Sequence, residues 1–211
     1  MWVDSTILSR TRSGTGMERA IHCACGALQG ELTTTATVNR GLCYCKDCQA
    51  FAHALQRAEC TLDAQGGTDI LQTSPQSVRI ASGHEQLACL RLTPTGLLRW
   101  YARCCNTLIG NTPPSRTISF VGLIHTCFDR AALDSIALPA MQVWTQSARG
   151  EPKPRRRLAL RGVLGLAGIV IGARFTGSYK SNPLFDANGQ PIALPRVLGN
   201  DELQTLRAKV G

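Results

Sequence analysis

The chain has 211 residues, of which 44% are hydrophobic and 18% are charged, and its formal net charge is +9. These values exclude an intrinsically disordered protein and allow one large domain, or one domain of about 130 to 150 residues with an appendage. The first 20 residues contain no apolar run of secretory length, so we expect the ten cysteines to be ligands in a reducing, cytoplasmic compartment rather than disulfides of an exported protein.

The N-terminal segment differs in composition from the rest of the chain. Residues 1–20 are rich in Ser, Thr, Gly and Arg and have no helical or strand periodicity, which predicts disorder. Met17 directly precedes the first patterned segment, and we hypothesise that the natural start is at this residue. We expect a metal-binding domain over residues 21–147 and a C-terminal part over residues 148–211.

The metal-binding domain begins with a cysteine pair. Residues 21–28 predict a strand that runs into a turn at Cys23-Ala24-Cys25-Gly26, where backbone amides can point at sulfur. Residues 28–38 carry a run of threonines, and their β-branched side chains predict a second strand.

The strongest chemical signal is the segment Cys43-Tyr44-Cys45-Lys46-Asp47-Cys48, which places three thiols in six positions. In a strand, Cys43 and Cys45 project to the same face, and a tight turn after Cys45 can bring Cys48 round to meet them. Three thiolates at this spacing suit a tetrahedral Zn²⁺ whose fourth position stays open to water or to a substrate atom. The alternative is a purely structural cluster of thiols. We therefore predict a zinc site that carries chemistry.

A short helix and several strands are expected after this cluster. Residues 49–56 predict the helix, and residues 59–80 predict strand fragments broken by Gly66-Gly67 and Ser74-Pro75. One more strand is expected over residues 118–128.

The clearest predicted hairpin joins residues 86–92 to residues 97–102 through the turn Thr93-Pro94-Thr95-Gly96. In this register Cys89 lies opposite Trp100. The hairpin leads directly into the adjacent pair Cys104-Cys105, so a second cysteine motif is expected at its end.

The C-terminal part begins with a basic linker and an apolar segment. From Arg149 to Arg161 there are six basic residues and one acidic residue, a local charge of +5. Residues 158–173 predict an apolar helix that is too short to span a bilayer, which needs about 20 residues. We expect it to pack on the metal-binding domain or on a partner subunit, with peripheral contact of residues 155–174 with a membrane as the alternative. Residues 201–210 predict a short amphipathic helix with Asn200 or Asp201 as its N-cap.

Three motifs together carry a resemblance to a known family. They are His22-Cys23-x-Cys25-Gly26, Cys43-x-Cys45-x-x-Cys48-Gln49 and Cys105-Asn106-Thr107 after a hairpin. The pattern resembles the glutathione-dependent formaldehyde-activating enzyme family, which includes the centromere protein V domain, over residues 21–123. The resemblance implies a mainly β fold, a zinc-pinned antiparallel β-tent, here with a short helical C-terminal extension that has no counterpart in the family core.

The resemblance also implies two zinc ions and an activity. Cys23, Cys25 and Cys105 fall on ligands of a structural ion. Cys43, Cys45 and Cys48 fall on the chemical site, where a glutathione adduct of formaldehyde would meet the metal. The implied activity is that of a carbon–sulfur lyase, and the implied partner is glutathione, a similar small thiol or its aldehyde adduct.

The chain departs from the family at the last structural ligand. The family spacing places a cysteine where this chain has Ala102, and Cys104 lies nearby instead. Neighbouring side chains tend to diverge, so either Cys104 completes the site in a distorted turn or another group does. His22, Cys89 and water are the other candidates. Asn106 replaces the family's glycine and tolerates the left-handed conformation.

A second hypothesis is a non-catalytic zinc module that acts through its basic C-terminal segment on a membrane, a protein or nucleic acid. Nucleic acid is disfavoured because no aromatic residues are interleaved with Arg155, Arg156 and Arg157. Within the catalytic hypothesis, His53 is a candidate proton donor if the helix after Cys48 faces the metal. The sequence does not indicate an oligomeric state.

Overall fold

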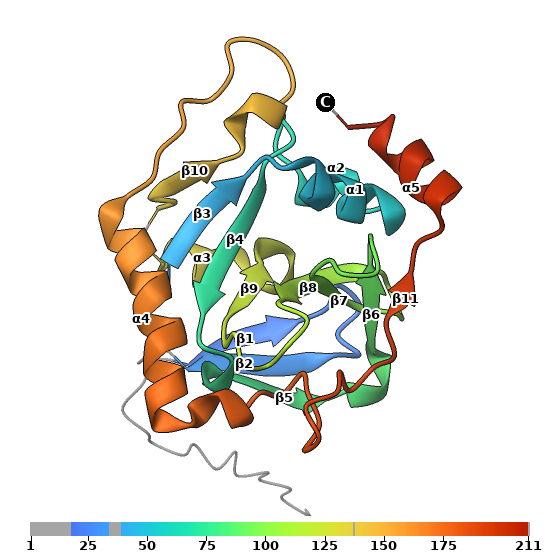
Figure 1. Cartoon of the computed structure of the whole chain (residues 1–211). Helices are drawn as coiled ribbons and strands as arrows, with labels where there is room; N and C mark the ends of the chain where they lie inside the picture. Colours follow the sequence, from blue (N-terminus) through green and yellow to red (C-terminus); the bar gives the residue numbers. More distant parts are fainter. Residues whose placement is uncertain (1–17, 34–38, 137, 211) are drawn as a thin grey trace, which may run out of the picture.

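The structure is a computed structural model, and it describes residues 18–33, 39–136 and 138–210. In these residues eleven strands form two sheets, flanked by a few helices (Figure 1). The predicted mainly β fold class is therefore confirmed. The predicted disordered segment up to residue 17, the proposed start at Met17, and residues 34–38 of the predicted Thr-rich strand lie outside the described residues.

The smaller sheet has three antiparallel strands in the order β1-β2-β5. They are β1 (Glu18–His22), β2 (Gln29–Thr33) and β5 (Val78–Ser82). β1 begins three residues before the domain boundary predicted at residue 21, because the backbone of residues 18–20 pairs with residues 31–33 of β2. This sheet lies at the lower end of the molecule in Figure 1.

The larger sheet has eight strands in the order β10-β3-β4-β9-β8-β7-β6-β11. They are β3 (Asn39–Cys43), β4 (Thr68–Thr73), β6 (Leu87–Arg91), β7 (Leu98–Ala102), β8 (Thr107–Thr112), β9 (Val121–Ile124), β10 (Met141–Val143) and β11 (Arg196–Val197). The inner pairs are antiparallel as predicted, but β10 pairs with β3 and β11 pairs with β6 in parallel. Both edge strands return from the C-terminal third of the chain over long connections, which a parallel pairing requires.

The predicted hairpin is confirmed in its register, since Cys89 of β6 lies opposite Trp100 of β7. The prediction for residues 59–80 was wrong in its first part, where α2 (Ala58–Thr61) forms in place of a strand. β8 and β10 were not predicted. All six residues of β8 are buried, so its sequence lacks the alternation of apolar and polar residues by which a half-buried strand is recognised.

Two hydrophobic cores lie on the two faces of the larger sheet. One core packs the larger sheet against the smaller one and includes Trp100, Leu71 and Leu32. The other core lies under two helices, α1 (Lys46–Ala54) and α5 (Asn200–Arg207), and includes Phe51 and Leu206. The segment at residues 107–112 runs between them, which explains why β8 is buried on both sides.

The C-terminal part does not form a separate appendage. β11 adds to the edge of the larger sheet, and α5 packs on α1. The N-cap of α5 is Gly199, one residue before the predicted Asn200 or Asp201. The remaining helical segments are α3 (Arg130–Asp134), α4 (Leu160–Thr176) and the short 3₁₀ turns η1 (Pro75–Ser77), η2 (His84–Gln86), η3 (His125–Cys127), η4 (Thr145–Ser147) and η5 (Ser178–Lys180).

The apolar helix α4 lies along β3 and β4 (Figure 1). Its first turn approaches the sheet so closely that a Cβ at Gly162 would stand 2.7 Å from the Met141 sulfur, and Asn39 donates a hydrogen bond of 3.2 Å to the Gly162 carbonyl. The predicted packing on the metal-binding domain is therefore observed for this end of the helix. Among the described residues, no helix has both the length and the apolar character required to cross a membrane.

Candidate metal centres

The three-cysteine site is formed where β3 passes into α1. Cys43 is the last residue of β3, Cys45 is the N-cap of α1, and Cys48 lies in its first turn. The backbone N–H of Cys48 donates to the Cys45 sulfur at 3.3 Å, as an N-cap side chain accepts from the third helical residue. The helix thus begins at Lys46, three residues before its predicted start. Cys45 is not part of a strand, and the first helical turn brings Cys48 toward the other two thiols.

The sulfur atoms of Cys43, Cys45 and Cys48 all lie within 4.8 Å of one another, and those of Cys43 and Cys48 are 3.8 Å apart. Zn–S bonds of about 2.3 Å in a tetrahedron place two sulfurs about 3.8 Å apart. A disulfide would require about 2.05 Å. The separation therefore suits ligands of one ion and not a covalent bridge.

A buried cation stands beside this site. Arg99 of β7 is only 3% exposed, and its Nη1 lies 4.0 Å from the Cys48 sulfur and 3.3 Å from Asn111 Oδ1. Its Nη2 lies 3.8 Å from Asp47 Oδ2, and the guanidinium stacks over the Phe51 ring at 5.4 Å. Arg99 and Asn111 are direct cross-strand partners on β7 and β8, so the sheet fixes the position of this charge.

The environment favours a thiolate at Cys48. Hydrogen bonds with the Cys43 and Cys45 thiols and the nearby charge of Arg99 hold the pKa of Cys48 well below its ordinary value, although burial acts in the opposite direction. A deprotonated thiol is the form that binds a metal ion.

A cavity of about 520 Å³ opens directly on the three thiols. Its lining includes Cys43, Cys45 and Cys48 together with Arg99 and Asn111. The volume lies in the range of small-molecule sites. An ion held by these three sulfurs would therefore face a space that a ligand can enter.

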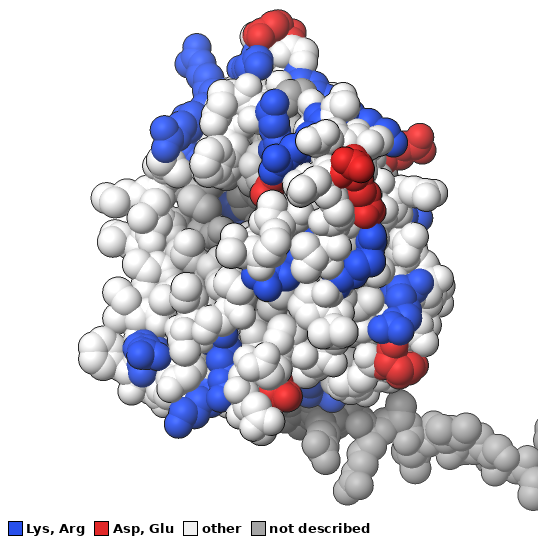
Figure 2. Space-filling view, turned by 45° about the vertical axis from the view of Figure 1, so that its right-hand side comes forward, with Lys and Arg blue, Asp and Glu red and all other residues white. Residues whose placement is uncertain are grey.

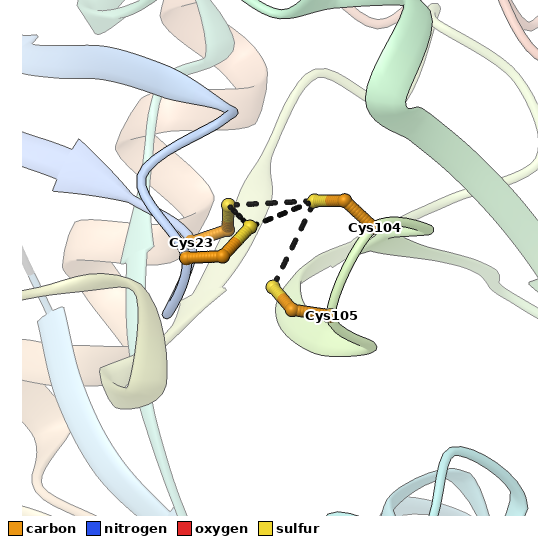
Figure 3. Close-up of side chains that lie close together, drawn as sticks. Cys23, Cys104 and Cys105 are labelled. Carbon is orange, nitrogen blue, oxygen red and sulfur yellow. Dashed lines mark hydrogen bonds between the residues drawn. The ribbon is translucent and has the colours of Figure 1, made fainter.

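The four-cysteine site joins the turn after β1 to the turn between β7 and β8 (Figure 3). Cys23 and Cys25 come from the first turn, and Cys104 and Cys105 come from the second. All four sulfurs lie within 4.8 Å of one another. Asn106, which follows the pair, has the predicted left-handed conformation with φ 55°.

Cys104 is the fourth thiol of this cluster. Its sulfur lies 3.7 Å from Cys23, 3.3 Å from Cys25 and 3.8 Å from Cys105, again close to the separation that zinc requires. The other proposed ligands lie elsewhere. The Cys89 thiol is buried in the core and points to the Leu90 carbonyl at 3.9 Å, and His22 Nε2 pairs with Asp129 at 2.9 Å.

Hydrogen bonds from backbone and side-chain donors reach the sulfurs of Cys23 and Cys105. The backbone N–H of Leu28 donates to the Cys23 sulfur at 3.2 Å, as predicted for a turn whose amides point at sulfur. Burial raises the pKa of Cys105, but hydrogen bonds from the Thr107 hydroxyl and from the backbone N–H groups of Cys25 and Thr107 outweigh burial and lower that pKa to about 6. Four thiols enclose the site, and this geometry is typical of structural zinc.

Sequence reasoning missed the cavity residues Arg99, Asn111 and Trp144, because the pairing of β7 with β8 and the turn after β10 bring them to the cavity beside Cys48. The sequence feature that could have indicated a role for Arg99 is its charge, since it stands between the apolar residues Leu98 and Trp100. His53 was named as a proton donor, but it is not among the cavity-lining residues, and its Nε2 lies 2.9 Å from Arg149 Nη2.

These features define a class: a mainly β protein with two cysteine clusters that could each hold a metal ion. The chain belongs to the family of unknown function DUF6151, whose model matches residues 17–193. This match covers both clusters and α4. No match was found among curated proteins.

Proposed function

We propose that the protein is a zinc-dependent carbon–sulfur lyase that cleaves adducts of an aldehyde and a small thiol, of the S-hydroxymethylglutathione type. The observation that carries the proposal is the convergence of Cys43, Cys45 and Cys48 on the wall of a cavity. The resemblance of the cysteine motifs to the formaldehyde-activating enzymes supports the same reaction. All ten cysteines are free, which supports a reducing compartment such as the cytoplasm.

Zinc held by Cys43, Cys45 and Cys48 would supply positive charge that stabilises a thiolate sulfur and lowers its pKa. Three thiolates carry more negative charge than one Zn²⁺ neutralises, which would weaken this effect. The Arg99 guanidinium, 4.0 Å from the Cys48 sulfur, offsets the excess. The protein therefore supplies both the ligands and the balancing charge.

In the proposed reaction the bond between sulfur and the hydroxymethyl carbon breaks, and its electron pair stays on sulfur. The hydroxyl proton passes to water, and the electron pair of the O–H bond forms the carbonyl of the aldehyde. Negative charge develops on that oxygen as the proton leaves. Arg99 lies beside Cys48 in the cavity lining and can donate to this oxygen, while Asn111 and Asp47 hold the guanidinium in place.

The test is formaldehyde release from S-hydroxymethyl adducts by the zinc-loaded protein. We expect a rate above the spontaneous one, a loss of about 10²- to 10³-fold in Arg99→Met, and partial retention in Arg99→Lys. Zinc content and thermal unfolding of both variants report whether the site is intact. If the wild-type protein accelerates release from no adduct, the proposal is wrong.

A second candidate function is a zinc-stabilised module that binds an anionic membrane surface through α4. Leu160, Leu164, Ile171 and Phe175 share one face of this helix and are 72%, 61%, 55% and 88% exposed. The sequence has seven basic residues and no acidic residue between Glu151 and Asp186. In the view of Figure 2, the left side of the molecular surface is largely uncharged, and basic residues lie above and below this region.

Sedimentation with lipid vesicles tests this candidate. We expect binding to vesicles that contain phosphatidylserine, weaker binding to phosphatidylcholine alone, and loss of binding in Leu164→Glu. Thr205→Glu on the exposed part of α5 adds the same charge away from α4 and serves as the control. Equal vesicle binding by the two variants would exclude a role of α4 in membrane binding.

A further inference from the structure

The cavity beside the three-cysteine site has a polar end at the cysteines and a mostly apolar wall elsewhere, although Gln72, Gln146 and Ser147 also line it. The charged residues of the lining are Lys46 and Asp47, which lie within the cysteine motif, and Arg99, which contacts Cys48. The apolar lining residues include Leu42, Ile70, Phe120, Met141, Val143 and Trp144. A ligand whose sulfur lies at the cysteines would therefore extend along an apolar surface.

Trp144 is the most unusual residue of this lining. It directly follows β10 and adopts the left-handed conformation, with φ 59° and ψ 32°, which bulky residues rarely do. Its side chain is 57% exposed although it lines the cavity. Backbone strain of this kind concentrates at ligand sites, and an exposed indole offers a face for an apolar or aromatic group.

The polar end of the cavity suits a single oxygen near the reacting sulfur. Arg99 is held by Asn111 and Asp47 and stacks on Phe51, so it cannot swing far into the cavity. A guanidinium has five N–H donors, more than these contacts occupy. Because Arg99 lies 4.0 Å from the Cys48 sulfur, those donors lie beside the three cysteines and not at the far wall.

Glutathione fits this cavity poorly. The tripeptide carries two carboxylates and one ammonium group, which need several charged partners when they leave water. Apart from Lys46 and Asp47 of the cysteine motif and Arg99 beside Cys48, the lining has no charged residue, so the far wall offers no charged partner for these groups.

We propose, building on the lyase function above, that the substrate is the aldehyde adduct of an apolar thiol, with an aryl or branched alkyl group packed against Trp144 and the apolar wall. The hydroxyl of the adduct then lies at Arg99, and the sulfur lies at Cys43, Cys45 and Cys48. The volume of about 520 Å³ accommodates a group of this size next to the sulfur.

The test is a binding titration of the cobalt-substituted protein with phenylmethanethiol and with glutathione, followed by thiolate-to-cobalt charge-transfer absorption. We expect phenylmethanethiol to bind at least about tenfold more tightly. Trp144→Asn removes the ring but tolerates the left-handed backbone, and it should lose about tenfold in affinity for phenylmethanethiol while affinity for glutathione stays unchanged. Trp144→Phe, which keeps a ring, should retain most of the affinity.

The outcomes separate this inference from the lyase proposal. Any of three results would overturn the assignment of an apolar substrate. They are equal or tighter binding of glutathione, equal losses of affinity for both thiols in Trp144→Asn, and no spectral change with either thiol. Cleavage of S-hydroxymethylglutathione together with a preference for glutathione would overturn it and leave the lyase function standing. Preferred binding of phenylmethanethiol without cleavage of any adduct would support the assignment and overturn the lyase function.

Discussion

Replacing Cys104 by Ser should remove the metal from the four-cysteine site and leave the three-cysteine site loaded. The Cys104 sulfur lies between 3.3 and 3.8 Å from the sulfurs of Cys23, Cys25 and Cys105, so it contacts every other member of the cluster. Structural zinc sites bind with about 10 to 16 kcal/mol, or about 2.5 to 4 kcal/mol for each of four ligands. We therefore expect zinc affinity at this site to fall about 10²- to 10³-fold.

The assay is zinc competition with a chromophoric chelator, combined with thermal unfolding. The wild type should release two ions in two steps, and Cys104→Ser should lose one of them at low chelator concentration with a lower midpoint of unfolding. Cys60→Ser is the neutral control, since Cys60 is exposed and belongs to neither cluster. Cys89 was a candidate ligand that lies in the core instead, so Cys89→Ser should keep both ions. Unchanged zinc binding in Cys104→Ser, or loss of zinc in Cys89→Ser, would refute the assignment.

Two further predictions concern stability and the independence of the sites. Gln49 is fully buried, and its amide donates 2.9 Å hydrogen bonds to the Tyr44 and Ser147 carbonyls, so Gln49→Ala should lower the free energy of unfolding in urea by about 2 to 4 kcal/mol by leaving both carbonyls unsatisfied. A loss below about 1 kcal/mol would show that these bonds are replaced. Cys45→Ser should leave a folded protein with about half of the zinc, measured by metal analysis and circular dichroism, because the four-cysteine site alone carries the structural ion. Global unfolding of this variant would indicate that the three-cysteine site is structural instead.

The features that sequence reasoning predicted correctly depend on local chemistry. The hairpin of β6 and β7 follows from a turn with Pro94 and Gly96 between two apolar runs, and its register was predicted correctly. The convergence of Cys43, Cys45 and Cys48 follows from their spacing within six residues. The backbone differs from the prediction, because Cys45 is a helix N-cap and not part of a strand. Cysteine is not among the usual N-cap residues, so the start of α1 at Lys46 was not predicted.

The features that it missed depend on contacts between distant segments. Arg99 becomes the neighbour of Cys48 because it contacts α1 at Cys48 and Phe51, and the assignment of Cys104 depends on how the turn after β7 meets the turn after β1. Strand β10 has three residues, too few for a periodic pattern. The C-terminal part looked like an appendage because pairing of β11 with β6 leaves no local trace in the sequence.

X-ray absorption at the zinc edge of the fully loaded protein tests the central claim most directly. One site with four sulfurs and one with three sulfurs and an exchangeable light atom average to 3.5 sulfurs per zinc. We expect this value in the free protein and a rise to four sulfurs per zinc when phenylmethanethiol is added. Four sulfurs per zinc without added thiol, or no change when the thiol is added, would contradict an open coordination position at Cys43, Cys45 and Cys48.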